Sequence, residues 1–188
     1  MGVAAKTLAR EESGADGAPR AGRAPRLGDL AEEIKSELGD EWLPALYRER
    51  IRTLRTRSFQ LPAAPKRASD VEVQHTLLGV ELRVGRRRVS CPDLATARYL
   101  AVFARAGCSE VAVPYDITKI SRLADELERA WQRMTLLADH LAAGRAQGFR
   151  TRLKKFIVET ARVEIIAEGA GAAVPAFNQN TRQRRRGA

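Results

Sequence analysis

The stretch that decides the fold of this chain is residues 80–141, VELRVGRRRVSCPDLATARYLAVFARAGCSEVAVPYDITKISRLADELERAWQRMTLLADHL. Apolar residues occupy every second position from Val80 to Val84, which is the period of a half-buried strand. Gly85 and Arg86 then supply a two-residue turn, and the alternation resumes at Val89. The pattern predicts a β-hairpin with three consecutive arginines at its tip.

A helix and a strand are predicted to follow this hairpin. Ser90 or Asp93 is suited to capping a helix over residues 93–106, and Gly107 is suited to its left-handed C-terminal position. The short apolar run Val111–Pro114 predicts the strand. Because a strand, a helix and a second strand in this order favour a crossover connection, we expect the return strand of the hairpin and the new strand to be parallel in one sheet.

The strongest helical pattern covers residues 117–143, where apolar residues step by three and four. Asp116 or Thr118 is suited to capping its start. Trp131 and Met134 fall in the apolar stripe, which predicts core packing; a docking face for a partner helix is the alternative. Together these elements predict an α+β fold, in which a small mixed β-sheet packs against long amphipathic helices.

The flanking segments differ in composition from this core. We expect the following organisation: residues 1–26 a disordered leader, 27–60 an N-terminal helical segment, 61–69 a linker, 70–168 the α+β core domain, and 169–188 a disordered basic tail.

Within the N-terminal helical segment, Leu30–Leu38 is predicted to be a short acidic helix that Asp29 caps and Gly39 ends. Asp40 is predicted to cap a second helix that tolerates Pro44 in its first turn.

Two further elements are expected in the core domain. Val71–Leu77 is predicted to be a strand that precedes the hairpin, and Phe149–Ala167 a helix. For residues 163–167, VEIIA, a strand is the alternative.

The net charge of +10 is unevenly distributed. Residues 27–41 carry a net charge of −5, residues 42–69 carry +6, residues 70–143 are neutral and residues 144–188 carry +7. The flanks of the core are therefore basic, whereas the core is not. Of the 33 basic residues, 27 are arginine, a bias that a GC-rich genome also produces, so the arginine content alone does not identify a phosphate-binding role.

The sequence predicts a cytoplasmic protein that does not cross a membrane. It contains no apolar run near eighteen residues and no apolar signal-peptide core at its N-terminus. Its two cysteines, Cys91 and Cys108, do not form a disulfide framework, so we expect both to be reduced.

The motifs of common enzyme classes are missing from the sequence. It has no phosphate-binding P-loop, no dinucleotide-binding glycine pattern, no clustered metal ligands and no nucleophile motif beside either histidine. We therefore expect no enzymatic activity, no cofactor and no metal.

Two weak catalytic hypotheses remain. Cys91 precedes a helix N-terminus, which can activate a thiol. Asp93 and Glu110 resemble the acidic pair of a metal-dependent nuclease, although the lysine of that pattern is missing.

The placement of the basic residues predicts a non-enzymatic protein that binds the phosphate backbone of RNA or DNA. The candidate contact residues are Arg48, Arg52, Arg55, Arg86, Arg87, Arg88, Arg150, Arg152, Lys154, Lys155, Arg184, Arg185 and Arg186. The alternative interpretation of each cluster is a solvent-exposed helix face or turn that binds nothing. The alternative function is a protein–protein adaptor or accessory subunit, whose basic arms contact an acidic partner surface.

Overall fold

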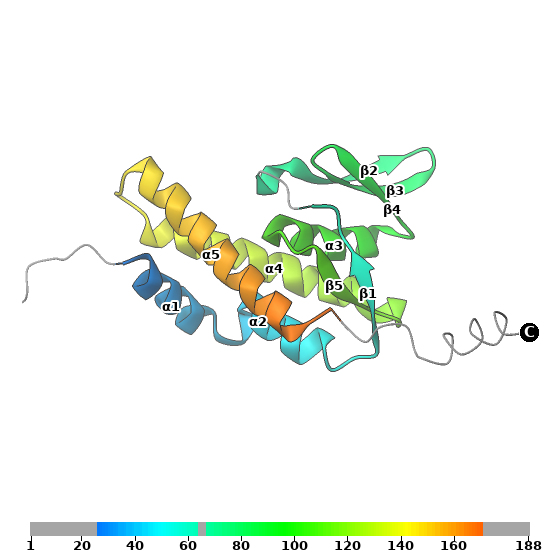
Figure 1. Cartoon of the computed structure of the whole chain (residues 1–188), viewed down its shortest axis with the longest axis horizontal. Coiled ribbons are helices and arrows are strands. Elements are labelled where there is room, and N and C mark those ends of the chain that lie inside the picture. The colour runs from blue at the N-terminus through cyan, green and yellow to red at the C-terminus, as the bar shows by residue number, and fades with distance from the viewer. Residues whose placement is uncertain (1–25, 64–66, 171–188) are drawn as a thin grey trace, which may run out of the picture.

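The computed structural model describes residues 26–63 and 67–170 (Figure 1). The predictions for the leader, and for the tail with Arg184, Arg185 and Arg186, lie outside the described residues. The helices are α1 (Leu27–Leu38), α2 (Leu43–Leu46), α3 (Leu94–Ala106), α4 (Ile117–Leu141) and α5 (Gln147–Glu168), with short helical turns η1 (Gly39–Glu41), η2 (Tyr47–Ile51, a π-helix) and η3 (Ala68–Asp70). The strands are β1 (Thr56–Gln60), β2 (Val71–Thr76), β3 (Gly79–Val84), β4 (Arg87–Cys91) and β5 (Glu110–Pro114).

The predicted α+β class is confirmed, but the predicted single mixed sheet is wrong. Strands β2, β3 and β4 form one antiparallel sheet, and β5 pairs with β1 in a second antiparallel sheet. The parallel pairing between the hairpin and the 111–114 strand therefore does not exist. It fails because β1, in a segment that we predicted to be helical, occupies the edge of β5, with Ser58 opposite Ala112.

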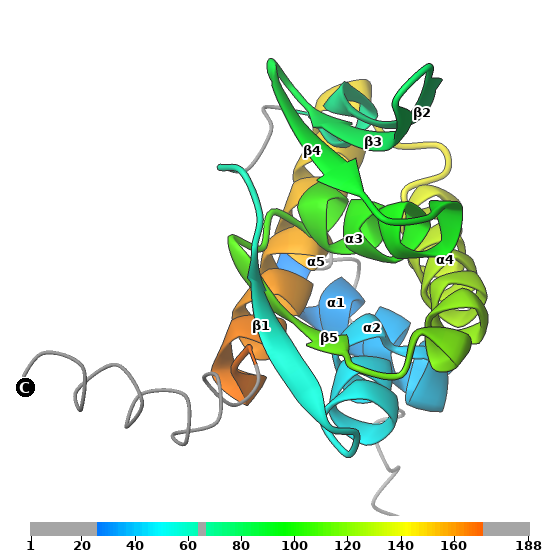
Figure 2. The same cartoon turned by 90° about the vertical axis from the view of Figure 1, so that its right-hand side faces the viewer.

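Helix α3 separates the two sheets instead of returning the chain to the first one (Figure 2). It packs against β2 and β3 on one side, and Tyr99 donates a hydrogen bond to the Ala112 carbonyl of β5 on the other, at 2.6 Å. Nine of its thirteen residues are buried. A helix that is apolar on all sides belongs in the middle of a fold, so α3 is the central element.

The local signals at the ends of the core elements are confirmed. Asp93 caps α3 by accepting a hydrogen bond from the Thr96 amide at 2.7 Å, and Gly107 is left-handed at φ 83°. Asp116 caps α4. Gly85 has φ 60°, which suits the first central position of a tight hairpin turn. Residues 163–167, left open between helix and strand, belong to α5.

The N-terminal helices differ in detail from the prediction. Helix α1 begins one turn earlier than expected, and Asp29 lies inside its first turn, where its carboxylate accepts a hydrogen bond from the Arg26 amide. The second helix is not continuous: η1, α2 and the π-helical turn η2 replace it. Pro44 lies in the first turn of α2, as predicted.

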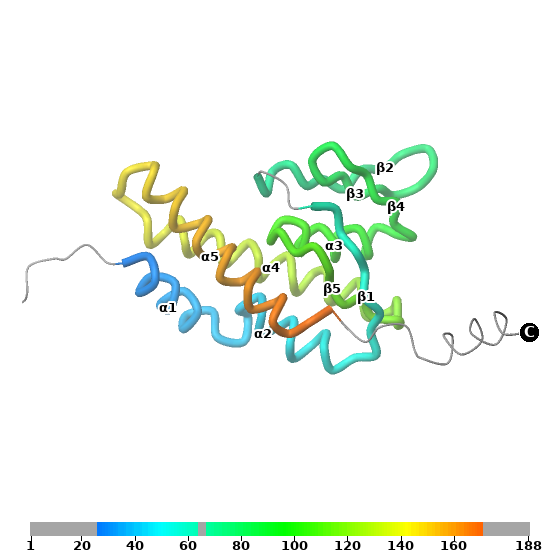
Figure 3. The backbone as a smooth tube through the Cα atoms, in the orientation of Figure 1, coloured from blue at the N-terminus to red at the C-terminus, as the bar shows by residue number. Residues whose placement is uncertain are grey.

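The helices α4 and α5 run antiparallel along one side of the molecule, as the backbone trace shows (Figure 3). Arg98 of α3 pairs with Glu128 and Asp125 of α4, at 2.5 and 2.8 Å, and so links these two helices. Trp131 and Met134 are buried, so the prediction that they pack in the core is confirmed. One hydrophobic cluster unites residues from α1 to α5.

Candidate nucleic-acid interface

The predicted basic residues lie in three separate places in the described structure. One group lies at the η2–β1 connection, one at the β3–β4 turn, and one in the first turns of α5 (Figure 1). The first group contacts the C-terminal end of α5, through Arg52 and the Glu168 carbonyl, and the third group lies at the N-terminal end of this helix. Sixteen residues of α-helix separate Arg152 from Glu168, or about 24 Å at 1.5 Å per residue. The predicted residues therefore do not form one continuous surface.

Two of the four basic residues at the start of α5 share one carboxylate, that of Asp139 of α4. Arg150 forms an ion pair and hydrogen bond with the Asp139 carboxylate, and Lys154 pairs with the same carboxylate at 2.7 Å. These contacts, that of Arg150 first, lower the pKa of Asp139 below its ordinary value. Arg152 donates to the Gly148 carbonyl at 3.3 Å, and Lys155 is exposed. Arg150 and Lys154 thus join α5 to α4, and together with Asp139 they keep one net positive charge rather than two.

The hairpin tip is exposed but small. Arg86 and Arg87 project from the turn, and neither forms an ion pair within the described residues. Arg88 pairs with Glu81 at 3.6 Å across the two strands. The tip therefore offers two free arginines of the three that were predicted.

The η2–β1 connection, residues 48–57 from η2 to the start of β1, holds the densest group of arginines that lack a carboxylate partner. Arg52 donates to the Glu168 carbonyl at 3.0 Å, and the Arg55 guanidinium lies 5.3 Å from the centre of the Tyr115 ring. Arg50 and Arg57 are exposed and form no ion pair within residues 26–63 and 67–170. Of the five arginines in this connection, Arg48 alone pairs with carboxylates, those of Glu49 and Glu168.

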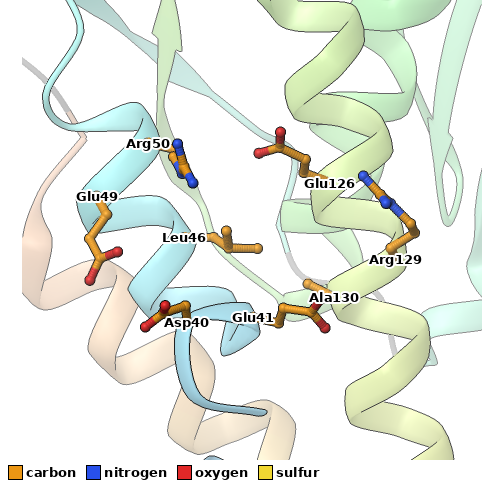
Figure 4. Close-up of a pocket in the computed structure, with 8 residues that line it drawn as sticks. All are labelled: Asp40, Glu41, Leu46, Glu49, Arg50, Glu126, Arg129 and Ala130. Atoms are coloured by element: carbon orange, nitrogen blue, oxygen red, sulfur yellow. The ribbon is translucent and has the colours of Figure 1, made fainter.

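Two adjoining hollows, of about 240 and 250 Å³, lie between this helical segment and α4. Their shared residues are Arg50 and Glu126. In the first hollow, Arg50 and Glu126 point into the space between the two segments (Figure 4). Three further carboxylates, those of Asp40, Glu41 and Glu49, also line this hollow, so it does not suit an anion.

The second hollow is basic. Arg50, Lys119 and Arg122 line it, with Leu54 and Leu123 as apolar neighbours. Its one carboxylate, that of Glu126, accepts a hydrogen bond from Arg122 at 2.8 Å. Sequence reasoning did not assign these three basic residues to the interface because they come from distant parts of the chain. The spacing of Lys119 and Arg122 on one side of a helix was the available signal.

The acidic pair of the nuclease hypothesis is not brought together. Asp93 lies at the start of α3 and is occupied in capping it, through the amide and hydroxyl of Thr96. Glu110 lies beyond the other end of α3, about 20 Å away along a thirteen-residue helix, where it hydrogen bonds with Ser58. Within the part of the chain that the structure describes, no three metal-ligating side chains cluster.

Cys91 does not have the environment of an activated thiol. It is buried, and burial raises its pKa, opposite to the lowering that the helix N-terminus suggested. Burial also raises the pKa of Cys108, to about 12. We therefore expect native protein at pH 8 to react slowly with a thiol-specific disulfide reagent, and guanidinium-unfolded protein to release two equivalents at once. Rapid release of one equivalent from the native protein would show that one thiol is activated.

Comparisons with known proteins do not assign the chain to a family. No family model, no curated protein and no solved structure matches it. Among the described residues, no helix combines the length and the apolar composition needed to span a membrane.

Proposed function

We propose that this chain is a non-enzymatic protein that binds the phosphate backbone of RNA or DNA through the basic end formed by residues 48–57. The single observation that carries the proposal is that Arg50, Arg52, Arg55 and Arg57 lack a carboxylate partner within the described structure. An arginine without a carboxylate partner keeps its positive charge available to a phosphate, and four such arginines occur within eight positions of the chain.

The neighbouring part of α4 brings two further basic side chains to this end. Lys119 and Arg122 line the second hollow together with Arg50, but Lys119 also pairs with Asp116 at 3.8 Å and Arg122 with Glu126 at 2.8 Å, so they add candidate contact sites rather than net charge. Contacts of this kind neutralise phosphates without distinguishing base sequences.

The test is binding of the full chain to duplex DNA, single-stranded DNA and structured RNA over a range of salt concentrations. We expect the substitutions Arg50→Gln, Arg55→Gln and Arg57→Gln, combined, to weaken binding and to reduce the salt dependence on duplex DNA by about 0.9 log units per log salt for each lost contact.

The matched control removes three arginines that already have carboxylate partners. Arg133, Arg150 and Arg162 pair with Glu41, Asp139 and Glu159. Their combined replacement by glutamine removes the same formal charge. Because these three arginines already pair with carboxylates, it should change the salt dependence much less. An equal effect of both triple variants, or no binding by the unaltered protein at physiological salt, would show that residues 48–57 are not a phosphate-binding surface.

One observation favours the adaptor function as a second candidate. Leu77 and Leu78, at the turn between β2 and β3, are 106% and 94% exposed. Two adjacent apolar side chains at a projecting turn suit the apolar pocket of a protein partner. Docking of this kind should survive high salt and should fail when both leucines are replaced by serine.

A further inference from the structure

The sheet formed by β1 and β5 has two outer edges, and the edge of β5 is closed at its centre. The Ala112 amide donates to the Tyr47 hydroxyl at 2.9 Å, and the Ala112 carbonyl accepts from the Tyr99 hydroxyl at 2.6 Å. Pro114, the next residue that points outward on β5, has no amide hydrogen to donate. Two buried tyrosines therefore take the place of a neighbouring strand.

The edge of β1 has no such closure within the described residues. Backbone hydrogen bonds lie at both ends of the ladder, from the Tyr115 amide to the Arg55 carbonyl at 3.1 Å and from the Leu61 amide to the Ser109 carbonyl at 2.8 Å. They show that the odd-numbered residues of β1 direct their N–H and C=O groups toward β5. In an antiparallel pair the intervening residues direct their N–H and C=O groups outward. These residues are Thr56, Ser58 and Gln60.

The accessible part of this edge is short and well defined. Thr56 is buried, whereas Ser58 is half-buried and Gln60 is exposed. Within residues 26–63 and 67–170, the backbone groups of Ser58 and Gln60 have no hydrogen-bond partner outside the ladder. Pro62, the next outward position, has no amide hydrogen. Figure 2 shows β1 on the outside of the fold. An extended peptide can add to such an edge through main-chain hydrogen bonds.

The side chains along the edge define the partner. Arg57 and Phe59 share one face of β1; Arg57 is exposed and Phe59 is half-buried against the core. Arg55 lies directly before the strand. A peptide strand beside them is best matched by a carboxylate next to Arg57 and an apolar side chain next to Phe59. These two positions are i and i+2 along the peptide, because side chains alternate between faces.

We propose that the outer edge of β1 binds an extended, acidic segment of a partner protein, which becomes the third strand of the β1–β5 sheet. The chain's own residues 171–188 are poorly suited to this position because they contain four arginines and no carboxylate. A second copy of the chain would bring its own Arg55 and Arg57 to the same short edge. The proposal shares Arg55 and Arg57 with the proposed phosphate-binding residues, but it also requires the main-chain groups of Ser58 and Gln60, which phosphate binding does not.

The experiment uses the full chain and a capped eight-residue peptide, Thr-Ile-Thr-Asp-Thr-Ile-Thr-Asp, in which apolar and acidic side chains alternate on one face. We expect the peptide at about 1 mM to shift the amide resonances of Ser58 and Gln60 while those of β2, β3 and β4 stay unchanged. The same peptide with lysine in place of aspartate should bind more weakly. Failure of the acidic peptide to shift either amide would overturn the proposal.

Two variants separate main-chain from side-chain contacts. Ser58→Pro removes an outward amide, whereas Ser58→Ala removes the hydroxyl and keeps the amide. We expect about tenfold or greater loss of peptide affinity for the proline variant and little change for the alanine variant. Equal affinities of the two variants would contradict strand addition.

A second route leaves the protein unaltered, so it remains valid if the proline variant does not fold. With the peptide antiparallel to β1, N-methylation at the threonines removes the amides that face β1, whereas N-methylation at isoleucine and aspartate removes amides that point away. The first set should not bind and the second should. Binding by both sets would overturn the proposal. Dimerisation of the unaltered chain that Ser58→Pro abolishes would replace the acidic peptide with a second copy as the occupant.

Discussion

Replacing Tyr47 with phenylalanine is expected to lower the free energy of unfolding by about 2–4 kcal/mol. The Tyr47 hydroxyl accepts a hydrogen bond from the buried Ala112 amide at 2.9 Å and donates one to the Gly169 carbonyl at 2.8 Å. Phenylalanine keeps the ring, which contacts Phe103 edge-on at 5.4 Å between centroids, but it leaves both backbone groups without a partner. A buried group that loses its partner costs about 1–3 kcal/mol, more than the hydrogen bond itself contributes.

The other two tyrosines of the chain provide graded controls for this measurement by denaturant or thermal unfolding. Tyr99→Phe leaves only the Ala112 carbonyl without a donor, so we expect a smaller loss, of about 1–2 kcal/mol. Tyr115 is exposed, and Tyr115→Phe keeps the ring beside Arg55, so its effect should lie within about 0.5 kcal/mol. A Tyr47→Phe variant as stable as Tyr115→Phe would show that the β5 edge is not held by these hydroxyls.

The sequence predicted the elements of the core better than their arrangement. Signals such as the Asp93 cap, the left-handed Gly107 and the Gly85 turn act within a few residues, so they remain valid in any fold that contains the element. Strand pairing depends on distant segments. The partner of β5 is β1, TRSFQ, whose alternation is too weak to identify a strand without its neighbour.

One signal for the arrangement was present in the sequence. The second half of α3, YLAVFARA at 99–106, is apolar on nearly every side. A helix that covers one sheet needs only one apolar face, whereas a helix between two layers needs two. This composition favoured a central helix over a simple crossover, and the structure shows that arrangement.

The candidate interface was predictable only in part. The sequence located the arginines of the η2–β1 connection but not their partners. Whether an arginine is free depends on carboxylates elsewhere, as with Asp139 of the preceding helix, which pairs with both Arg150 and Lys154. The number of basic residues near the start of α5 therefore overstated its free positive charge. It also gave no sign that Lys119 and Arg122 of α4 lie beside Arg50.

The second large effect that we expect is a loss of stability in alkaline solution. Burial raises the pKa of Cys108 from an ordinary value of 9.0 to about 12, and burial also raises the pKa of Tyr99 well above that of a free tyrosine. A folded-state pKa above the unfolded value means that the unfolded chain releases its proton first. The stabilisation is therefore complete below the unfolded pKa and is lost as the pH rises towards the folded one.

The free energy of unfolding should accordingly fall above pH 9 and fall more steeply above pH 10, where the buried tyrosines contribute. Each such group adds a slope of about 1.4 kcal/mol per pH unit, so Cys108 alone accounts for about 4 kcal/mol between pH 9 and 12. Cys91, whose pKa is also raised, adds to the first part of the decline. Urea unfolding measured from pH 7 to 11 provides the curve.

The variants assign each part of this curve to a residue, because slopes rather than absolute stabilities are compared. The double variant Cys91→Ala and Cys108→Ala should be less stable at pH 7, since both thiols are buried, yet nearly flat between pH 9 and 10. Tyr47→Phe should reduce the slope only above pH 10, because its hydroxyl also has a raised pKa. A wild-type curve that stays level from pH 8 to 11 would mean that these groups titrate as freely in the folded protein as in the unfolded chain, and that the centre of the fold around α3 and β5 is open to solvent.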